Sequence, residues 1–244
     1  VAVTCNSPNP ASSQAPLPSC AMRGVGVVRV DARAQQVVST TLAALASPGC
    51  FGPVVERLPN DGDGQEREGT EVRVCYDDQA LYMAWTCTDS DIQATFTQRD
   101  SRFWEEEVAE FFVTAGELDR YFELQWNPLG GVFDAIIRNQ LGKDGASKKF
   151  EGEWGYTAAG MKSAVQVKGT VADSSDKDGY WQVEVVVPFS DLGRATPKPG
   201  EVWRANFYRF NRGKNQPAEL LSWSPTQLPG FHQPSRFGYL EFGK

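Results

Sequence analysis

Histidine, paired cysteines and long apolar runs are scarce or missing in this sequence. Its single histidine, His232, and its five cysteines, none of which forms a C-x-x-C pair, argue against a zinc site. No apolar run approaches the roughly 20 residues that a membrane-spanning helix needs. The first four residues lack the basic and apolar regions of a signal peptide. Membrane insertion is therefore not expected.

Positively charged residues are fewer than negatively charged ones. The 24 Lys and Arg residues stand against 31 Asp and Glu, which gives a formal net charge of -7. Such a chain repels a polyphosphate backbone and offers no basic stripe to anionic lipid. Nucleic acid is therefore not an expected partner.

Turn-forming residues are plentiful, and the segments between them are short. The chain has 23 Gly and 15 Pro, and Asp77-Asp78, Asp178-Gly179 and Pro199-Gly200 mark turns. Apolar residues recur with period two in nine segments, 71–76, 81–87, 108–113, 121–126, 132–137, 163–171, 180–187, 201–210 and 239–242. This pattern predicts an all-β fold, a two-sheet antiparallel β-sandwich or jelly roll.

The N-terminal region differs from the rest. Residues 1–24 are too rich in Pro and Ser for regular structure and are predicted to form an extended arm. Residues 25–244 are predicted to form one domain, with a short strand at 25–30, a helix or turn at 35–46 and a polar loop at 60–69.

All the cysteines, Cys5, Cys20, Cys50, Cys75 and Cys87, lie in the first 90 residues. Disulfides that pin the arm to the domain would fit this clustering, with one thiol left over. We therefore expect an oxidising compartment, extracellular or an organelle lumen. Five reduced thiols are the alternative.

Two segments carry candidate binding residues. Along Tyr121–Trp126 the side chains alternate, so the triplet Phe122, Leu124 and Trp126 should face the core, and Glu123 and Gln125 the opposite side. A carboxylate and an amide suit the recognition of hydroxyl groups, although a solvated sheet face would look the same. Trp104 stands in an acidic, turn-like segment, where an exposed indole would match the flat C–H face of a sugar and a buried one would simply pack in the core.

The segments Trp104–Phe112, Tyr121–Asn127 and SWSPTQLPGFHQPSRFGYLEF at the C-terminus, in this order, resemble carbohydrate-binding module family 9 and its DOMON-like, family-9-like bacterial relatives. The similarity runs from about residue 72 to 242 and includes TFTQRDS at 95–101. It implies a β-sandwich that holds a sugar, often a chain end, between two aromatic side chains, with calcium supporting its loops.

The resemblance also implies a set of ligand-binding residues. Trp104 and Phe231 fall on the two aromatic walls, and Phe231 replaces a tryptophan. Glu123 and Gln125 replace an arginine and an asparagine, and this changes the hydrogen bonds that the site can form. The full predicted set is Trp104, Glu110, Glu123, Gln125, Asn127, Arg209, Phe231 and His232.

A structural calcium is a further candidate. The acidic turn that holds Asp89 and Asp91, like the loop with Asp61 and Asp63, offers oxygen ligands of the kind calcium prefers. Neither matches a loop motif of fixed spacing, so the residues favour plain solvated turns over a calcium site.

Three other functions compete with sugar binding. An acid hydrolase could use two of Glu105, Glu106, Glu107 and Glu110, but neighbours on one turn rarely face each other across a ligand. A haem-binding sandwich of the DOMON type would need His232 with a methionine. A structural or interaction module of a larger assembly would keep the sandwich and lose the sugar. We expect a non-catalytic domain whose partner is a polysaccharide or glycan.

Overall fold

The computed structural model describes residues 67–143, 145–214, 217–227 and 230–243, together with the backbone of 28–31 and 54–57. Its strands are β1 (Val28–Asp31), β2 (Val54–Arg57), β3 (Thr70–Tyr76), β4 (Ala80–Thr88), β5 (Val108–Thr114), β6 (Arg120–Trp126), β7 (Val132–Leu141), β8 (Ser147–Glu153), β9 (Lys162–Lys168), β10 (Tyr180–Pro188), β11 (Val202–Asn211), β12 (Glu219–Ser222) and β13 (Gly238–Phe242). Two single-turn 3₁₀ helices, η1 (Phe103–Glu105) and η2 (Pro234–Arg236), are the only helical elements of the described residues.

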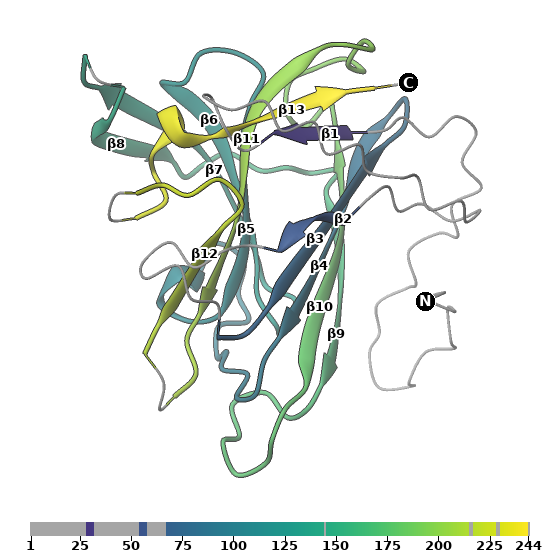
Figure 1. Cartoon of the computed structure of the whole chain (residues 1–244), viewed down its shortest axis with the longest axis vertical. Coiled ribbons are helices and arrows are strands. Elements are labelled where there is room, and N and C mark those ends of the chain that lie inside the picture. The colour runs from purple at the N-terminus through teal and green to yellow at the C-terminus, as the bar shows by residue number, and fades with distance from the viewer. Residues whose placement is uncertain are drawn as a thin grey trace.

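The strands form two antiparallel sheets (Figure 1). The larger has the order β1-β13-β11-β5-β6-β7-β8, with β12 also paired to β11, and the smaller has the order β2-β3-β4-β10-β9. The expected two-sheet β-sandwich is confirmed. The hairpin expected around Asp77-Asp78 is also present, as β3 and β4.

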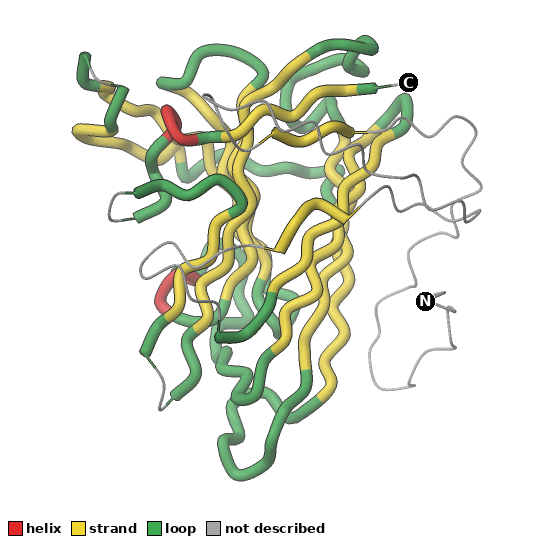
Figure 2. Tube along the Cα trace, viewed as in Figure 1, coloured by secondary structure: helices red, strands yellow, loops and turns green. Residues whose placement is uncertain are grey.

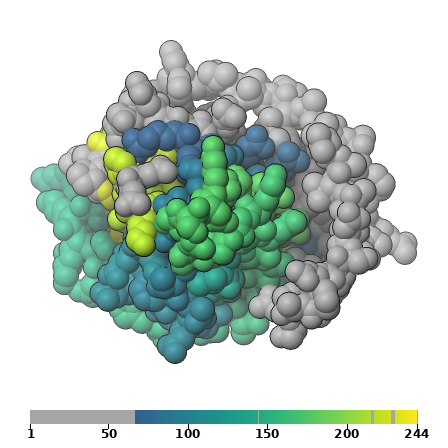
Figure 3. Space-filling model, turned by 90° about the horizontal axis from the view of Figure 1, so that it is seen from below, coloured from purple at the N-terminus to yellow at the C-terminus, as the bar shows by residue number. Residues whose placement is uncertain are grey.

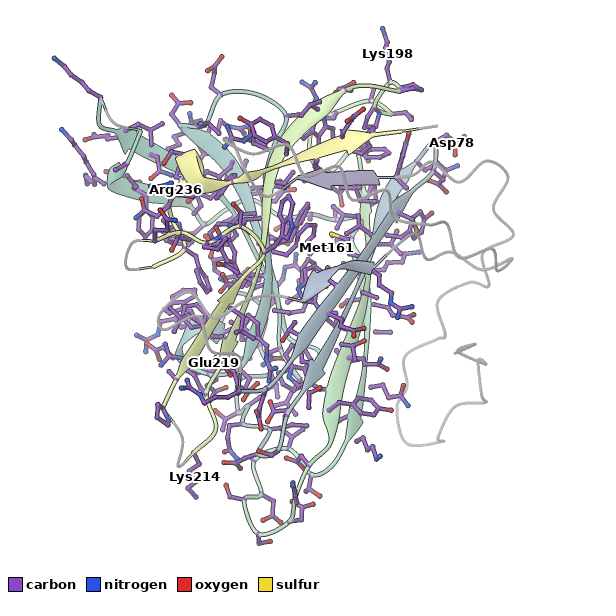
Figure 4. All side chains as sticks on the ribbon, viewed as in Figure 1. Asp78, Met161, Lys198, Lys214, Glu219 and Arg236 are labelled. Carbon is purple, nitrogen blue, oxygen red and sulfur yellow. The ribbon has the colours of Figure 1, made fainter. Side chains whose placement is uncertain are left out.

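Large aromatic side chains fill the space between the sheets. Trp85 on β4 lies 5.4 Å from Trp126 on β6 and 5.8 Å from Phe207 on β11, measured between ring centroids. Phe122 and Leu124 belong to the same cluster, so the predicted core face of β6 is confirmed. Figure 4 shows the side chains that occupy this layer, near the labelled Met161.

The larger sheet is covered on its outer face as well. A second apolar cluster there includes Phe112, Tyr121, Phe133 and Tyr208 of the sheet and Phe103 and Phe231 of the covering loops. Figure 2 shows both short helices, in red, on this side of the sheet. As a consequence every residue of β5 is buried, and the polar side chains on the outer face of β6 are buried too.

Strands that lack an apolar alternation were missed. The sequence of β8 is SKKFEGE, mostly exposed at the sheet edge, and β12 is only four residues long. The connection between β9 and β10 projects from one end of the sandwich, where Figure 3 shows its green atoms at the centre of the view.

The predicted arm at 1–24 and the helix or turn at 35–46 lie outside the described residues. Within the described part, no helix is long and apolar enough to cross a membrane.

Candidate functional site

A pocket of about 230 Å³ opens beside η1, on the outer side of the larger sheet. Three aromatic side chains line it: Trp104 of η1, Phe133 of β7 and Trp154, which directly follows β8. Asp100, Arg102 and Asp134 supply the polar part of the lining. The pocket thus combines apolar rings with hydrogen-bonding groups, which is the usual composition of a small-molecule site.

The loop before η1 holds Trp104 in place. The Glu106 carboxylate accepts hydrogen bonds from the backbone N–H groups of Thr95 (2.7 Å) and Phe96 (3.2 Å). The Trp104 indole then meets the Phe133 ring edge-on, with 5.5 Å between centroids and 83° between planes. Trp104 remains half-buried, and part of its ring faces the pocket.

The polar residues predicted on β5 and β6 lie close together, and all of them are buried. Glu110 pairs across the strands with Gln125, and Gln125 Nε2 donates a hydrogen bond to Glu123 Oε1 (2.5 Å). Burial raises the pKa of Glu110 well above its usual value, and the nearby Glu123 raises it further. Burial also raises the pKa of Glu123, to about 8. The pair therefore does not carry two negative charges at neutral pH.

His232 lies above this pair. Its Nδ1 is 2.7 Å from the Tyr121 hydroxyl, and its Nε2 is 4.0 Å from Glu123 Oε2. The imidazole stacks on Phe150 at 3.7 Å, and burial lowers its pKa to about 4. A neutral histidine thus lies beside the buried Glu123 carboxyl group.

Phe231 does not face the pocket. It is 3% exposed and stacks on Tyr208, with 4.0 Å between centroids and 13° between planes. The Tyr208 hydroxyl also donates a hydrogen bond to the Phe231 carbonyl (3.1 Å). Phe231 is thus packed into the outer cluster. It is absent from the pocket lining, whereas Trp104 is part of that lining.

Asn127 and Arg209 make contacts within the protein. Asn127 Oδ1 accepts from the N–H groups of Gly131 (2.7 Å) and Leu129 (3.2 Å), and its Nδ2 donates to the Phe96 carbonyl (2.7 Å). Arg209 is fully buried, and its Nη2 lies 2.6 Å from Asp89 Oδ2 and 3.3 Å from Glu107 Oε2. The structure therefore brings neither side chain to the pocket.

The carboxylates of Asp89 and Asp91 do not fit a calcium site. Asp89 binds Arg209 through one oxygen and the Asp91 N–H (2.9 Å) through the other. Asp91 accepts from Gln93 Nε2 (2.7 Å) and the Lys214 N–H (2.8 Å). Both groups already have protein donors, and no cluster of three or more metal-binding side chains occurs among the described residues.

Two of the five cysteines lie in the described part, Cys75 on β3 and Cys87 on β4. Both are buried, and no disulfide joins one to the other. Burial raises the pKa of Cys87 to about 12, so this thiol is unreactive at neutral pH. Cys5, Cys20 and Cys50 lie outside the described residues, and the disulfides stay a prediction.

Solved structures with the same fold were found by comparison. A protein from Bacteroides uniformis ATCC 8492, provisionally described as carbohydrate-binding, matches with a TM-score of 0.57 and 21% identity over 76% of this chain and 84% of that one. A carbohydrate-binding module family 9 domain from Caldicellulosiruptor kristjanssonii, solved with glucose, matches with a TM-score of 0.51 and 15% identity over 78% and 85%. A carbohydrate-binding module family 9 structure from the same organism, solved with cellotriose, matches with a TM-score of 0.51 and 14% identity over 78% of this chain and 83% of that one. Identities this low show the fold alone.

The architecture and the pocket define an antiparallel β-sandwich with an aromatic-lined site on the outer side of its larger sheet. No curated protein matches the chain. The model of carbohydrate-binding family 9 matches residues 65–242. The chain therefore belongs to carbohydrate-binding family 9, and the resemblance seen in the sequence is confirmed.

Proposed function

We propose that this domain binds carbohydrate without cleaving it, and that the sugar contacts Trp104 in the pocket beside η1. Family membership and the related domains solved with glucose and cellotriose support the ligand class. The observation that carries the location is the position of Trp104, half-buried with its ring lining an open pocket. A flat indole offers the apolar plane that a pyranose ring stacks on.

The surroundings of the acidic segment support a non-catalytic role. Glu105 pairs with Arg102 at 2.9 Å, Glu106 holds the loop at Thr95, and Glu107 contacts the buried Arg209. Glycoside cleavage needs two carboxyl groups that flank one bond of the substrate. These side chains are already engaged with protein groups. We expect that incubation with oligosaccharides yields no catalytic release of products; sustained release would contradict the proposal.

Replacing Trp104 by Ala should weaken sugar binding by about 30-fold to 100-fold. An aromatic wall removes roughly 100 Å² of apolar surface from water, at about 25 cal/mol per Å². The measurement is a calorimetric titration with glucose, xylose, galactose, cellobiose and cellotriose. Two such contacts and a few hydrogen bonds, set against the cost of association, predict dissociation constants between about micromolar and millimolar for the wild type.

Val202→Ala is the matched control, because Val202 is 48% exposed and does not line the pocket. It should bind like the wild type. Equal affinity of Trp104→Ala and wild type would remove the pocket from the proposal. No response of the wild type to any sugar would favour the alternative, an interaction module that has lost its ligand.

We also propose that the domain works in an oxidising compartment, outside the cytoplasm. The clustering of Cys5, Cys20 and Cys50 near the N-terminus supports this location. Intact mass after alkylation without reductant tests it, since bonded cysteines take up no label. Labelling of all the cysteines in the unfolded, unreduced protein would contradict it.

A further inference from the structure

Trp154 is unusually exposed for a tryptophan and is nevertheless held in a fixed position. Its exposed fraction is 58%, larger than that of Leu129, Phe150 or Val202. The indole lies against the backbone of Gly152 on β8, so closely that a Cβ at residue 152 would clash with the ring. A tryptophan that is exposed and also oriented by its neighbours is a feature of binding surfaces.

Phe133 lies between the two tryptophans. Its ring is 5.5 Å from Trp104 and 5.9 Å from Trp154, measured between centroids. Phe133 itself is 3% exposed and packs in the outer cluster, so it forms the base of the pocket. Both indoles thus contact the same rigid aromatic base.

Asp134, next to Phe133, has one oxygen without a partner. It is 1% exposed and borders the pocket, but it pairs with Leu124 of the inter-sheet core, so its side chain points to the face of β7 opposite Phe133. Its Oδ2 accepts hydrogen bonds from Arg99 Nη2 and from the Ala158 N–H (3.3 Å), whereas its buried Oδ1 accepts none. This oxygen lies on the inner side of β7, where a ligand over Phe133 would not reach it.

We propose that a neutral pyranose lies over Phe133 between Trp104 and Trp154, so that Trp154 forms the second wall of the site. This inference rests on the proposed function and names the second wall of that site. It assigns to Trp154 the role that the sequence resemblance gave to Phe231.

The size and charge of the pocket select the ligand. Its 230 Å³ is below the roughly 300 Å³ typical of pockets for drug-sized ligands, so one sugar ring fits better than two. Arg102 already pairs with Glu105 (2.9 Å), and Arg99 pairs with Asp134. Both guanidinium groups beside the pocket are thus engaged, and Asp100 adds a second carboxylate to the lining. A uronic acid would therefore be repelled where a neutral sugar is accepted.

A substitution at Gly152 tests the position of the Trp154 indole without changing a residue that would contact the sugar. Gly152→Ala adds a methyl group that must displace the Trp154 indole, whereas Gly155→Ala adds the same group where no atom lies within 4 Å. The experiment is a calorimetric titration of wild type, Trp154→Ala, Gly152→Ala and Gly155→Ala with glucose, xylose, galactose, cellobiose and cellotriose. Glucuronic and galacturonic acid are titrated in parallel.

We expect a loss of affinity of about 30-fold to 100-fold for Trp154→Ala and about 10-fold for Gly152→Ala, with none for Gly155→Ala. Neutral sugars should bind more tightly than the two uronic acids.

The outcomes separate the two proposals. Sugar binding by the wild type that is unchanged in Trp154→Ala and Gly152→Ala would overturn this inference and leave the proposed function standing. Tighter binding of a uronic acid would overturn the assignment of a neutral ligand. If none of the sugars binds the wild type, the proposed function itself fails, and this inference with it.

Discussion

Replacing Arg209 by Met is expected to lower the free energy of unfolding by about 3–5 kcal/mol. The guanidinium contacts Asp89, Glu107, Thr70 Oγ1 (3.2 Å) and the Thr88 carbonyl (2.9 Å), and all of it is buried. Burial raises the pKa of Asp89 and of Glu107, while the charge of Arg209 lowers it. Without the arginine, two carboxyl groups remain in the interior with no cation beside them.

Urea denaturation of the purified variant measures this loss. Arg138→Met is the matched control, because Arg138 and its partner Glu153 are 61% and 42% exposed. An exposed pair contributes about 0–1 kcal/mol. The triple variant Arg209→Met/Asp89→Asn/Glu107→Gln should recover much of the stability, because it leaves no buried charge. A loss below 1 kcal/mol in Arg209→Met would contradict the structural role of this arginine.

The buried carboxyl of Glu123 should make the protein less stable as the pH rises from 6.5 to 8. Its pKa in the folded state is raised to about 8, above the value of an exposed glutamate, so the folded state binds the proton more tightly. The resulting stabilisation is complete below the unfolded pKa and is lost as the pH rises through the folded pKa. One such proton changes stability by up to about 1.4 kcal/mol per pH unit.

The comparison of wild type with Glu123→Gln isolates this effect. The variant should gain up to about 2 kcal/mol relative to wild type between pH 6.5 and 8. Below pH 6.5 the neutral His232 acts in the opposite direction, since its pKa is lowered to about 4. Glu117→Gln, at an exposed position, is the control and should follow the wild type. Parallel stability profiles of wild type and Glu123→Gln would show that residue 123 is already ionised in the folded protein.

The fold could be predicted largely because its central strands alternate. In β6 the triplet Phe122, Leu124 and Trp126 packs between the sheets as expected. The edge strand β8 could not be predicted, because its lysines and glutamates face solvent and give no apolar pattern. The cover over the outer face was also unexpected, since it is formed by loops far along the chain that contain Phe231 and Phe237.

The candidate site could be predicted only in part. Trp104 was found because an indole in an acidic turn is unusual, and the structure places it at a pocket. Trp154 and Asp134 were missed. The exposed Trp in the segment EGEWGY was the available signal for the first, whereas the unpartnered oxygen of Asp134 depends on contacts with Arg99 and Ala158 that no local pattern shows. Arg209 and Asn127 matched a family position, but their partners in space are protein groups.

A crystal structure of the domain with cellotriose would test the location of the site most directly. The account predicts electron density for a sugar ring over Phe133, flanked by Trp104 and Trp154. Density over Glu110 and Glu123, with Phe231 turned out of its stack on Tyr208 to cover the ring, would contradict it.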